Sequence, residues 1–80
     1  MKFTQYFLYI IQRPDHAKIR MEWIEETINN PDYGEVQSDG RIRKWKKIKG
    51  EGKFLRVILL PDGETVHNVF FDRSFKGGTK

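Results

Sequence analysis

The segment from residue 15 to residue 29 has apolar positions at helical spacing. These positions are four, three and four residues apart and are Ala17, Met21, Ile24 and Ile28. Such a period is typical of an amphipathic helix that buries one stripe of its surface. Asp15 suits the N-cap position, and Pro31 ends the element because the residue before a proline avoids helical dihedral angles. The pattern therefore predicts a helix over residues 15–29.

Residues 3–13 fit two patterns. Phe3, Phe7 and Ile10 follow a helical period, whereas the aromatic and β-branched residues of the same segment are typical of strands. We favour a short helix that ends where the chain turns at Pro14, and the strand stays open as the alternative.

The chain after residue 32 alternates between strand-like runs and turns. The runs cover residues 33–37, 41–48, 53–60 and 64–71, and a turn sequence containing glycine separates each run from the next. Short connections force neighbouring strands to be antiparallel. We therefore predict an α+β fold in which one or two N-terminal helices are packed on a four-stranded antiparallel meander.

Length and composition limit the classes of protein that remain. Eighty residues make one domain, residues 1–80, and we expect residues 76–80 to form a frayed tail. The chain has no cysteine and its two histidines are far apart in sequence, so we expect neither a metal site nor a cofactor. No apolar run reaches transmembrane length and no secretory signal is present, which favours a cytoplasmic protein that does not contact a membrane.

Positive charge is concentrated in the middle of the chain. Residues 41–56 hold eight of the fifteen basic residues and one acid, whereas residues 1–40 have a net charge of −3 and residues 57–80 a net charge of zero. A concentrated group of basic residues attracts polyanions, and nucleic acid is the commonest polyanion in a cell.

The basic run also alternates with a period of two, so a strand would sort it onto two faces. One face would carry Arg41, Arg43, Trp45 and Lys47, and the other Ile42, Lys44, Lys46 and Ile48. Cations neutralise phosphates, and an indole ring stacks on a base for about 1–3 kcal/mol. The predicted nucleic-acid-binding residues are Arg41, Arg43, Lys44, Trp45, Lys46 and Lys47. The alternative is an edge strand whose lysines only prevent edge-to-edge association.

Three residues are candidates for catalysis, namely His67, Arg56 and Arg73. The free pKa of a histidine lies near neutrality, so His67 could act as general acid or base while the two arginines stabilise a negative charge. The alternatives are structural. The His67 ring forms a hydrogen bond with a backbone partner within the sheet, and Arg73 pairs with Asp72 to hold the C-terminal tail.

The turn at 61–63 decides whether Arg56 and His67 share a face. A two-residue loop pairs Ile58 with His67 and puts Arg56 on the same face. A three-residue loop with a bulge pairs Val57 with His67 and separates the histidine from Arg56. The Pro-Asp-Gly sequence favours the bulged turn.

Several stretches resemble the RelE/BrnT-like small toxins of bacterial toxin–antitoxin pairs. They are the helical opening that ends in NNP, the sequence DGRIRKW and the sequence FLRVILLPDGETVHNVFFDRSFK, in an order that covers nearly the whole chain. The resemblance implies a metal-independent endoribonuclease that acts on RNA and is neutralised by an antitoxin protein. The positions that match its basic and histidine site residues are Arg43, Arg56, His67 and Arg73.

Three functions follow as hypotheses. The first is RNA cleavage, in which the ribose 2′-OH attacks the adjacent phosphorus and His67 transfers the proton. The second is a nucleic-acid-binding protein without catalysis. The third is a protein-interaction module whose basic face takes an acidic partner such as an antitoxin.

Overall fold

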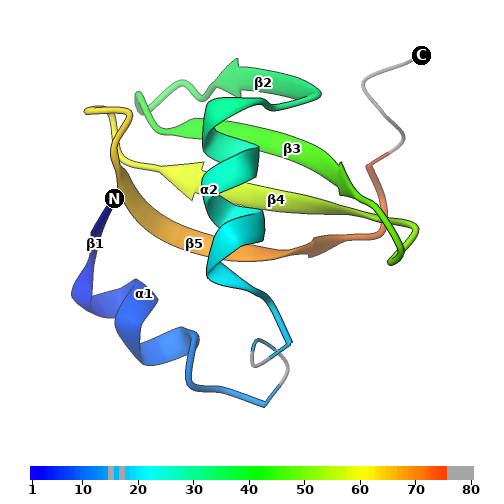
Figure 1. Ribbon diagram of the computed structural model, residues 1–80. Helices are drawn as coiled ribbons and strands as arrows, with labels where there is room; N and C mark the ends of the chain where they lie inside the picture. Colours follow the sequence, from blue (N-terminus) through cyan, green and yellow to red (C-terminus); the bar gives the residue numbers. More distant parts are fainter. Residues whose placement is uncertain (15, 17, 76–80) are drawn as a thin grey trace.

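One sheet and two helices make up the fold. The computed structural model describes residues 1–14, 16 and 18–75. Along the chain the elements are β1 (Lys2–Phe3), α1 (Gln5–Ile10), α2 (Met21–Asn29), β2 (Tyr33–Val36), β3 (Ile42–Ile48), β4 (Lys53–Leu59) and β5 (Thr65–Asp72). Figure 1 shows α2 lying across one face of the sheet, with α1 below it near β1 and β5.

The sheet contains five strands in the order β1-β5-β4-β3-β2. The predicted α+β class is confirmed, and the four predicted strands are antiparallel neighbours in chain order. The sheet is nevertheless mixed rather than a four-stranded antiparallel meander, because β1 adds a fifth strand parallel to β5. A strand of two residues is too short to show the alternation that identifies a strand in a sequence.

The N-terminal segment forms the favoured short helix, and only Lys2 and Phe3 before it form a strand. Lys2 and Phe3 pair with β5, and helix α1 follows directly after Thr4. The Thr4 hydroxyl accepts a hydrogen bond from the Phe7 backbone N–H at 3.0 Å, which is the usual interaction of an N-cap residue. Phe7 and Ile10 then lie on the buried side of the helix.

Helix α2 begins at Met21, six residues later than predicted, and ends at Asn29 as predicted. Before it the chain forms turns in which backbone N–H groups bond to the carbonyl group three residues earlier. Ile19 reaches the core from these turns, which explains why apolar spacing alone made the predicted helix too long. The predictions for residues 15 and 17 and for the tail at 76–80 lie outside the described residues.

The core lies between the sheet and the two helices. Its buried apolar side chains come from α1, the turn before α2, α2 itself and strands β3, β4 and β5, and they are Phe7, Ile10, Ile19, Ile24, Ile48, Leu55, Val57, Leu59, Val66 and Val69. Strand β4 contributes three of them and has a strand on each side, as expected for a central strand.

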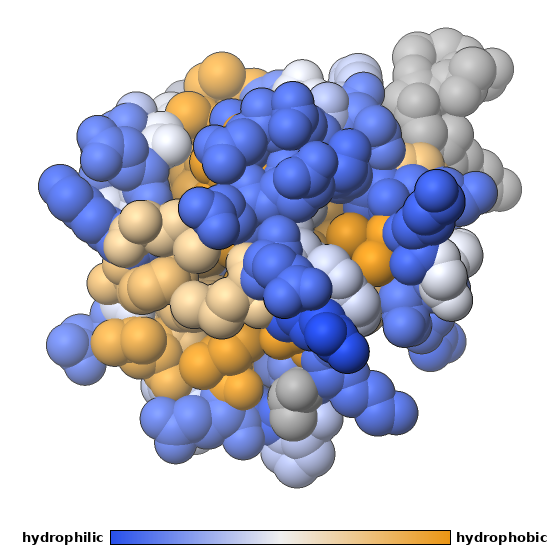
Figure 2. Space-filling model, viewed as in Figure 1, coloured by the Kyte–Doolittle hydropathy of each residue, from blue (hydrophilic) through white to orange (hydrophobic). Residues whose placement is uncertain are grey.

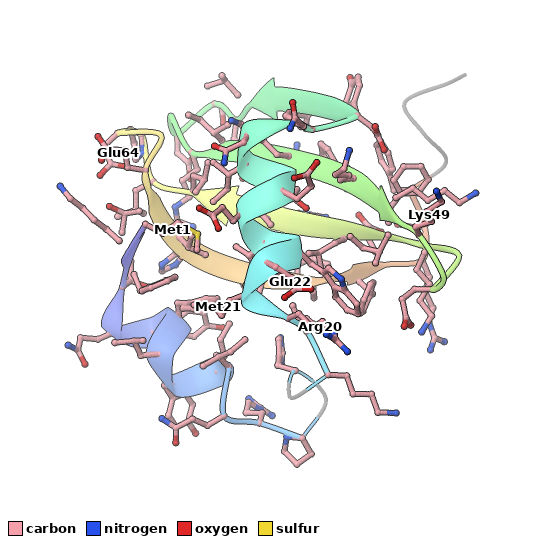
Figure 3. All side chains as sticks on the ribbon, in the orientation of Figure 1. Met1, Arg20, Met21, Glu22, Lys49 and Glu64 are labelled. Atoms are coloured by element: carbon pink, nitrogen blue, oxygen red, sulfur yellow. The ribbon has the colours of Figure 1, made fainter. Side chains whose placement is uncertain are left out.

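The face that carries α2 is mostly polar but has several apolar areas. Figure 2 shows the broadest of them beside α1 and the lower part of α2. Met1 and Met21 are 53% and 47% exposed, and Figure 3 places both between the two helices. Within the described residues, no helix is long and apolar enough to cross a membrane.

A bulge in β5 sets the register between β4 and β5. His67 is an extra residue between two regular pairs, Leu59 with Val66 and Ile58 with Asn68. Val66 points into the core, whereas His67 and Asn68 lie on the other side of the sheet. Next to the turn, the pairing of Leu59 with Val66 follows the register predicted for the two-residue loop, but the bulge shifts Ile58 to Asn68, so neither predicted partner of His67 is observed.

Candidate nucleic-acid interface

Strand β3 sorts its residues onto two faces as predicted. Trp45 pairs with Arg56 on the face that has no helix over it within the described residues, and we call this the open face. Lys44 pairs with the buried Val57 on the face that α2 covers. Of the predicted binding residues within β3, those on the open face are Arg43, Trp45 and Lys47, and those on the helix face are Lys44 and Lys46.

Lys44 and Lys46 bond to the C-terminal end of α2. Lys44 Nζ donates to the Ile28 carbonyl oxygen at 2.8 Å, and Lys46 Nζ donates to the Asn30 carbonyl oxygen at 3.0 Å. The last turn of α2 has no basic residue of its own, and its free carbonyl groups carry partial negative charge. The two lysines therefore stabilise the helix from the neighbouring strand.

The arginines of the basic run are paired with carboxylates. Arg43 forms a salt bridge with Glu35 on β2, and Arg56 forms one with Asp72 on β5 at 3.3 Å. The side chain of Arg41, just before β3, lies 3.7 Å from the carboxylate of Asp39. The protein's own acids therefore neutralise most of the arginine charge that the sequence assigns to binding.

Trp45 is only 4% exposed. Phe75 stacks on its ring with centroids 4.4 Å apart and planes 7° from parallel. The guanidinium groups of Arg43 and Arg56 lie 5.7 and 5.6 Å from the Trp45 centroid. Phe75 thus occupies the stacking position that the sequence predicts for a base.

Asp72 connects Trp45 and Arg56 with the C-terminal segment. One carboxylate oxygen accepts hydrogen bonds from Trp45 Nε1 at 3.0 Å and Arg56 Nη1 at 3.3 Å, and the other accepts from the backbone N–H and hydroxyl of Ser74. Burial pushes the pKa of Asp72 upward, but these hydrogen bonds together outweigh it and lower the pKa from 3.8 to about 2. Asp72 is ionised at neutral pH, and its partner is Arg56 rather than Arg73.

His67 lies apart from Arg56 and Arg73. Its Nδ1 atom is 3.2 Å from the Thr4 hydroxyl oxygen and its ring is 5.1 Å from that of Tyr6, so it connects β5 with the start of α1. Arg56 pairs with Phe70, which follows His67 by three positions on β5 and is therefore roughly 10 Å from it. The Arg56 guanidinium bonds to Asp72, two positions beyond Phe70, so it points away from the histidine. Arg73 is six positions from His67, roughly 20 Å of extended chain. The structure does not bring the three candidate catalytic residues together.

A second group of cations lies where the β3–β4 hairpin meets the end of β5. We call this region the basic end, and its members are Lys47, Lys49, Lys53 and Arg73. All four side chains are exposed, and none forms a salt bridge with a carboxylate of the described residues. Figure 3 shows Lys49 projecting from the hairpin. The basic end therefore carries positive charge that the fold does not neutralise.

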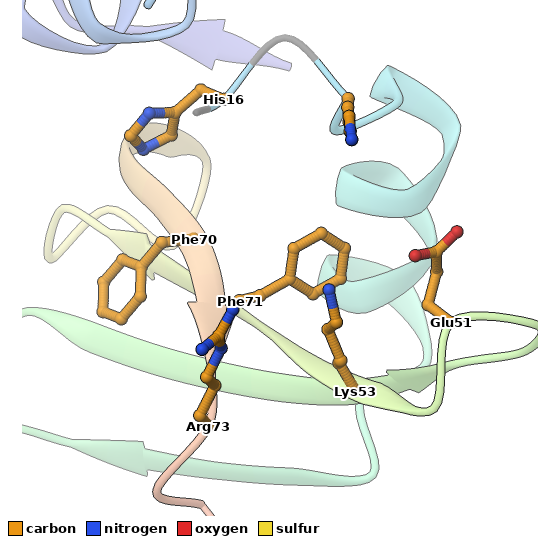
Figure 4. Close-up of a pocket in the computed structure, with 7 residues that line it drawn as sticks. His16, Glu51, Lys53, Phe70, Phe71 and Arg73 are labelled. Atoms are coloured by element: carbon orange, nitrogen blue, oxygen red, sulfur yellow. The ribbon is translucent and has the colours of Figure 1, made fainter. Parts of the chain in front are cut away.

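In the described part of the chain, three hollows border the basic end; one of about 470 Å³ lies along the β3–β4 hairpin beside Lys47, Lys49 and Asp32, and the other two neighbour each other. Of the two neighbouring hollows, the first, of about 260 Å³, is lined by Lys47, Lys53 and Arg73 together with Phe54, Phe75, Gly52 and the carboxylate-bearing Asp72. The second, of about 330 Å³, shares Lys53 and Arg73 and extends to the turn before α2 (Figure 4). Because two cations border both hollows, an extended anion could contact them from either side.

Sequence reasoning selected Lys47 and Arg73 but missed Lys53 and Phe75. Lys53 belongs to the basic run, and only the pairing of β3 with β4 shows that it lies near Lys47. Phe75 follows the last strand, and no local pattern indicates that the chain turns back there. Among the described residues, no group of three or more His, Asp or Glu side chains could hold a metal ion.

Comparisons with protein-family models, with curated proteins and with solved structures found no match for this chain. The interpretation of the site therefore depends on its own residues and their contacts.

Proposed function

We propose that the protein binds single-stranded RNA at the basic end of its sheet. The observation that carries this proposal is that Lys47, Lys53 and Arg73 line one hollow and have no carboxylate partner among the described residues. Binding to phosphates requires cations, and cations without an internal carboxylate partner can contact a phosphate without losing a salt bridge.

Aromatic rings beside these cations favour a single strand over a duplex. Phe54 lines the same hollow as the three cations, and Tyr33 and Trp45 lie beside it, with Phe75 packed among the three rings. The bases of a single strand are free to stack on such rings, whereas the bases of a duplex are stacked on one another. The resemblance to RNA-cleaving toxins is a second reason to choose RNA.

The proposal is tested by measuring the affinity for a fluorescent single-stranded RNA over a range of salt concentrations. We expect the logarithm of the association constant to fall linearly with the logarithm of salt concentration, by about 0.7 for each phosphate neutralised. Replacing Lys47, Lys53 and Arg73 together by alanine should reduce this slope by about 2. A wild-type protein without salt-dependent affinity for RNA would refute the function.

A matched control removes three exposed cations outside the basic end, namely Lys2, Arg13 and Arg41. Both triple variants lower the net charge by the same amount, so the control separates location from total charge. We expect the control to keep nearly all of the affinity. Equal losses in the two variants would contradict the proposed location, and tighter binding to DNA of the same sequence would contradict the choice of RNA.

RNA cleavage, a place among the RelE/BrnT-like toxins and an acidic antitoxin partner stay predictions of the sequence. Cleavage is tested by incubating RNA with the protein in excess EDTA, beside the variant His67→Ala. Metal-independent cleavage that depends on His67 would add catalysis to binding. Intact RNA would leave binding as the function. An acidic partner is tested by co-purification with a neighbouring gene product.

A further inference from the structure

Phe75 sits in a group of aromatic rings on the open face. It stacks on Trp45 at 4.4 Å, meets Phe54 edge-on at 5.0 Å and lies 5.6 Å from Tyr33 at a tilt of 40°. The three surrounding rings come from β3, β4 and β2, so the sheet itself builds the site and the C-terminal segment only fills it.

The site is held in place by contacts that do not involve Phe75. Trp45 Nε1 donates to Asp72, and the guanidinium groups of Arg43 and Arg56 lie within 6 Å of the indole centroid. These contacts fix the orientation of the indole. The ring of Phe75, by contrast, contributes only its aromatic contacts to this group.

The position of Phe75 borders the cationic hollow at the basic end. The same hollow is lined by Lys47, Lys53 and Arg73, and also by Asp72, whose carboxylate oxygens accept hydrogen bonds from Trp45, Arg56 and Ser74. A flat ring that replaced Phe75 and carried a negatively charged group would place that group beside these three cations. A nucleotide has both parts, a base that stacks and a phosphate, whereas Phe75 supplies the ring alone.

We propose that Phe75 occupies a nucleobase-binding subsite formed by Tyr33, Trp45 and Phe54, and that a base of a bound single strand displaces it. This inference rests on the proposed function, because it assigns one base of the bound RNA to that subsite. Phe75 then competes with the base, so the affinity measured for the full chain is lower than the intrinsic affinity of the open subsite.

The test compares the full chain with the full-length variants Phe75→Ala and Phe75→Leu. Removing the competing ring should raise the affinity for single-stranded RNA about 2- to 10-fold. This is the change in an equilibrium constant that corresponds to the interaction free energy of one aromatic pair. Phe75→Leu keeps apolar volume near Trp45 without a ring to stack, so it should also bind more tightly if Phe75→Ala folds poorly. The control is Tyr9→Ala, which removes an aromatic ring that is 67% exposed on α1 and should leave the affinity unchanged.

A second readout follows Trp45 directly. In a Trp23→Phe background Trp45 is the only indole, and its fluorescence should be quenched by adenosine monophosphate more strongly in Phe75→Ala than in the parent. Ribose 5-phosphate has the phosphate without a base, so its binding to the basic end should be the same in both proteins.

The outcomes separate this inference from the proposed function. Salt-dependent RNA binding that Phe75→Ala and Phe75→Leu do not strengthen would overturn the subsite and leave the function standing. If neither the parent nor the variants bind RNA, both proposals fail. In that case, quenching of Trp45 by a short acidic peptide containing tyrosine would assign the subsite to a protein partner instead.

Discussion

The middle of β3 and the lysines of the basic end come from one basic run, yet their side chains have different partners. In the middle, Arg43 contacts Glu35, and Lys44 contacts the end of α2. At the basic end, the side chains of Lys47 and Lys53 have no carboxylate partner among the described residues, although the Lys47 backbone N–H donates to Asp32. The positive charge of a sequence segment is therefore a poor guide to where a polyanion can bind.

The difference follows from what each part of β3 lies beside. Strand β2, which carries Glu35, pairs only with residues 42–45 of β3, and α2 ends near Lys44 and Lys46. The chain beyond Lys46 extends past both elements to the hairpin. Carboxylate or carbonyl partners are thus available to the basic side chains of residues 41–46, whereas those of Lys47 and Lys53 have no carboxylate partner among the described residues. On this account the paired side chains stabilise the fold, and the basic end binds the proposed ligand.

The largest expected effect comes from removing a partner in the paired region. Asp72→Ala leaves the guanidinium of Arg56 and the indole N–H of Trp45 without their acceptor. We expect a loss of about 3 kcal/mol in the free energy of unfolding, at the low end for a buried ion pair because the Arg56 side chain is 23% exposed. Urea denaturation measures this loss.

The control for this variant is Asp39→Ala at the exposed pair with Arg41. An exposed pair contributes little, so the control should change the free energy of unfolding by at most about 1 kcal/mol. Equal losses in both variants would show that the buried network around Trp45 has no special role.

The pH dependence of stability isolates the same carboxylate. The pKa of Asp72 is 3.8 as a model value and about 2 in the folded protein. A depressed pKa gives stability that is fully present above pH 4 and is lost as the pH falls through about 2, for a total of about 2 kcal/mol.

Asp62 titrates over the same range, because hydrogen bonds from the Thr65 side chain and from the backbone of Glu64 and Thr65 lower its pKa to about 2. The Asp72→Asn variant separates the two carboxylates. Its free energy of unfolding should decline less steeply between pH 4 and pH 2 than that of the parent protein. A decline as steep as in the parent protein would assign the acid sensitivity elsewhere.

A smaller and more selective effect separates the two kinds of lysine. Lys44→Met keeps the apolar stem but removes the hydrogen bond to the Ile28 carbonyl, so it should cost about 1 kcal/mol of stability and leave the RNA affinity unchanged. Lys47→Met should leave stability within about 0.5 kcal/mol and reduce the salt dependence of RNA binding by about 0.7. Weaker RNA binding in Lys44→Met, together with a loss of stability in Lys47→Met, would contradict the distinction between the two regions.

Much of the fold is visible in the sequence because its signals are local. The three turn sequences and the alternation between them give the four antiparallel strands, and the Asn29 end of α2 follows from the proline two residues later. The start of α2 and the strand β1 were missed for a physical reason. Ile19 is buried from a turn rather than a helix, and Lys2 and Phe3 are a strand only because β5 lies beside them.

The site is less visible because it depends on register and on distant partners. The two faces of β3 were predicted, but the acids that neutralise Arg43 and Arg56 lie on other strands. The bulge at His67 shifts the histidine along β5, and a turn sequence alone does not encode a bulge several residues away. Phe75 reaches Trp45 only because the chain turns back after Asp72.

The most direct measurement is a backbone NMR titration of the protein with single-stranded RNA at low salt. The account predicts that the largest shift changes occur at residues 47–54 and 72–75 and at the subsite residues Tyr33 and Trp45, with small changes at Glu35, Val36 and the end of α2. Changes centred on Glu35, Arg43 and Lys44 would show that RNA binds the paired region, and would contradict the account.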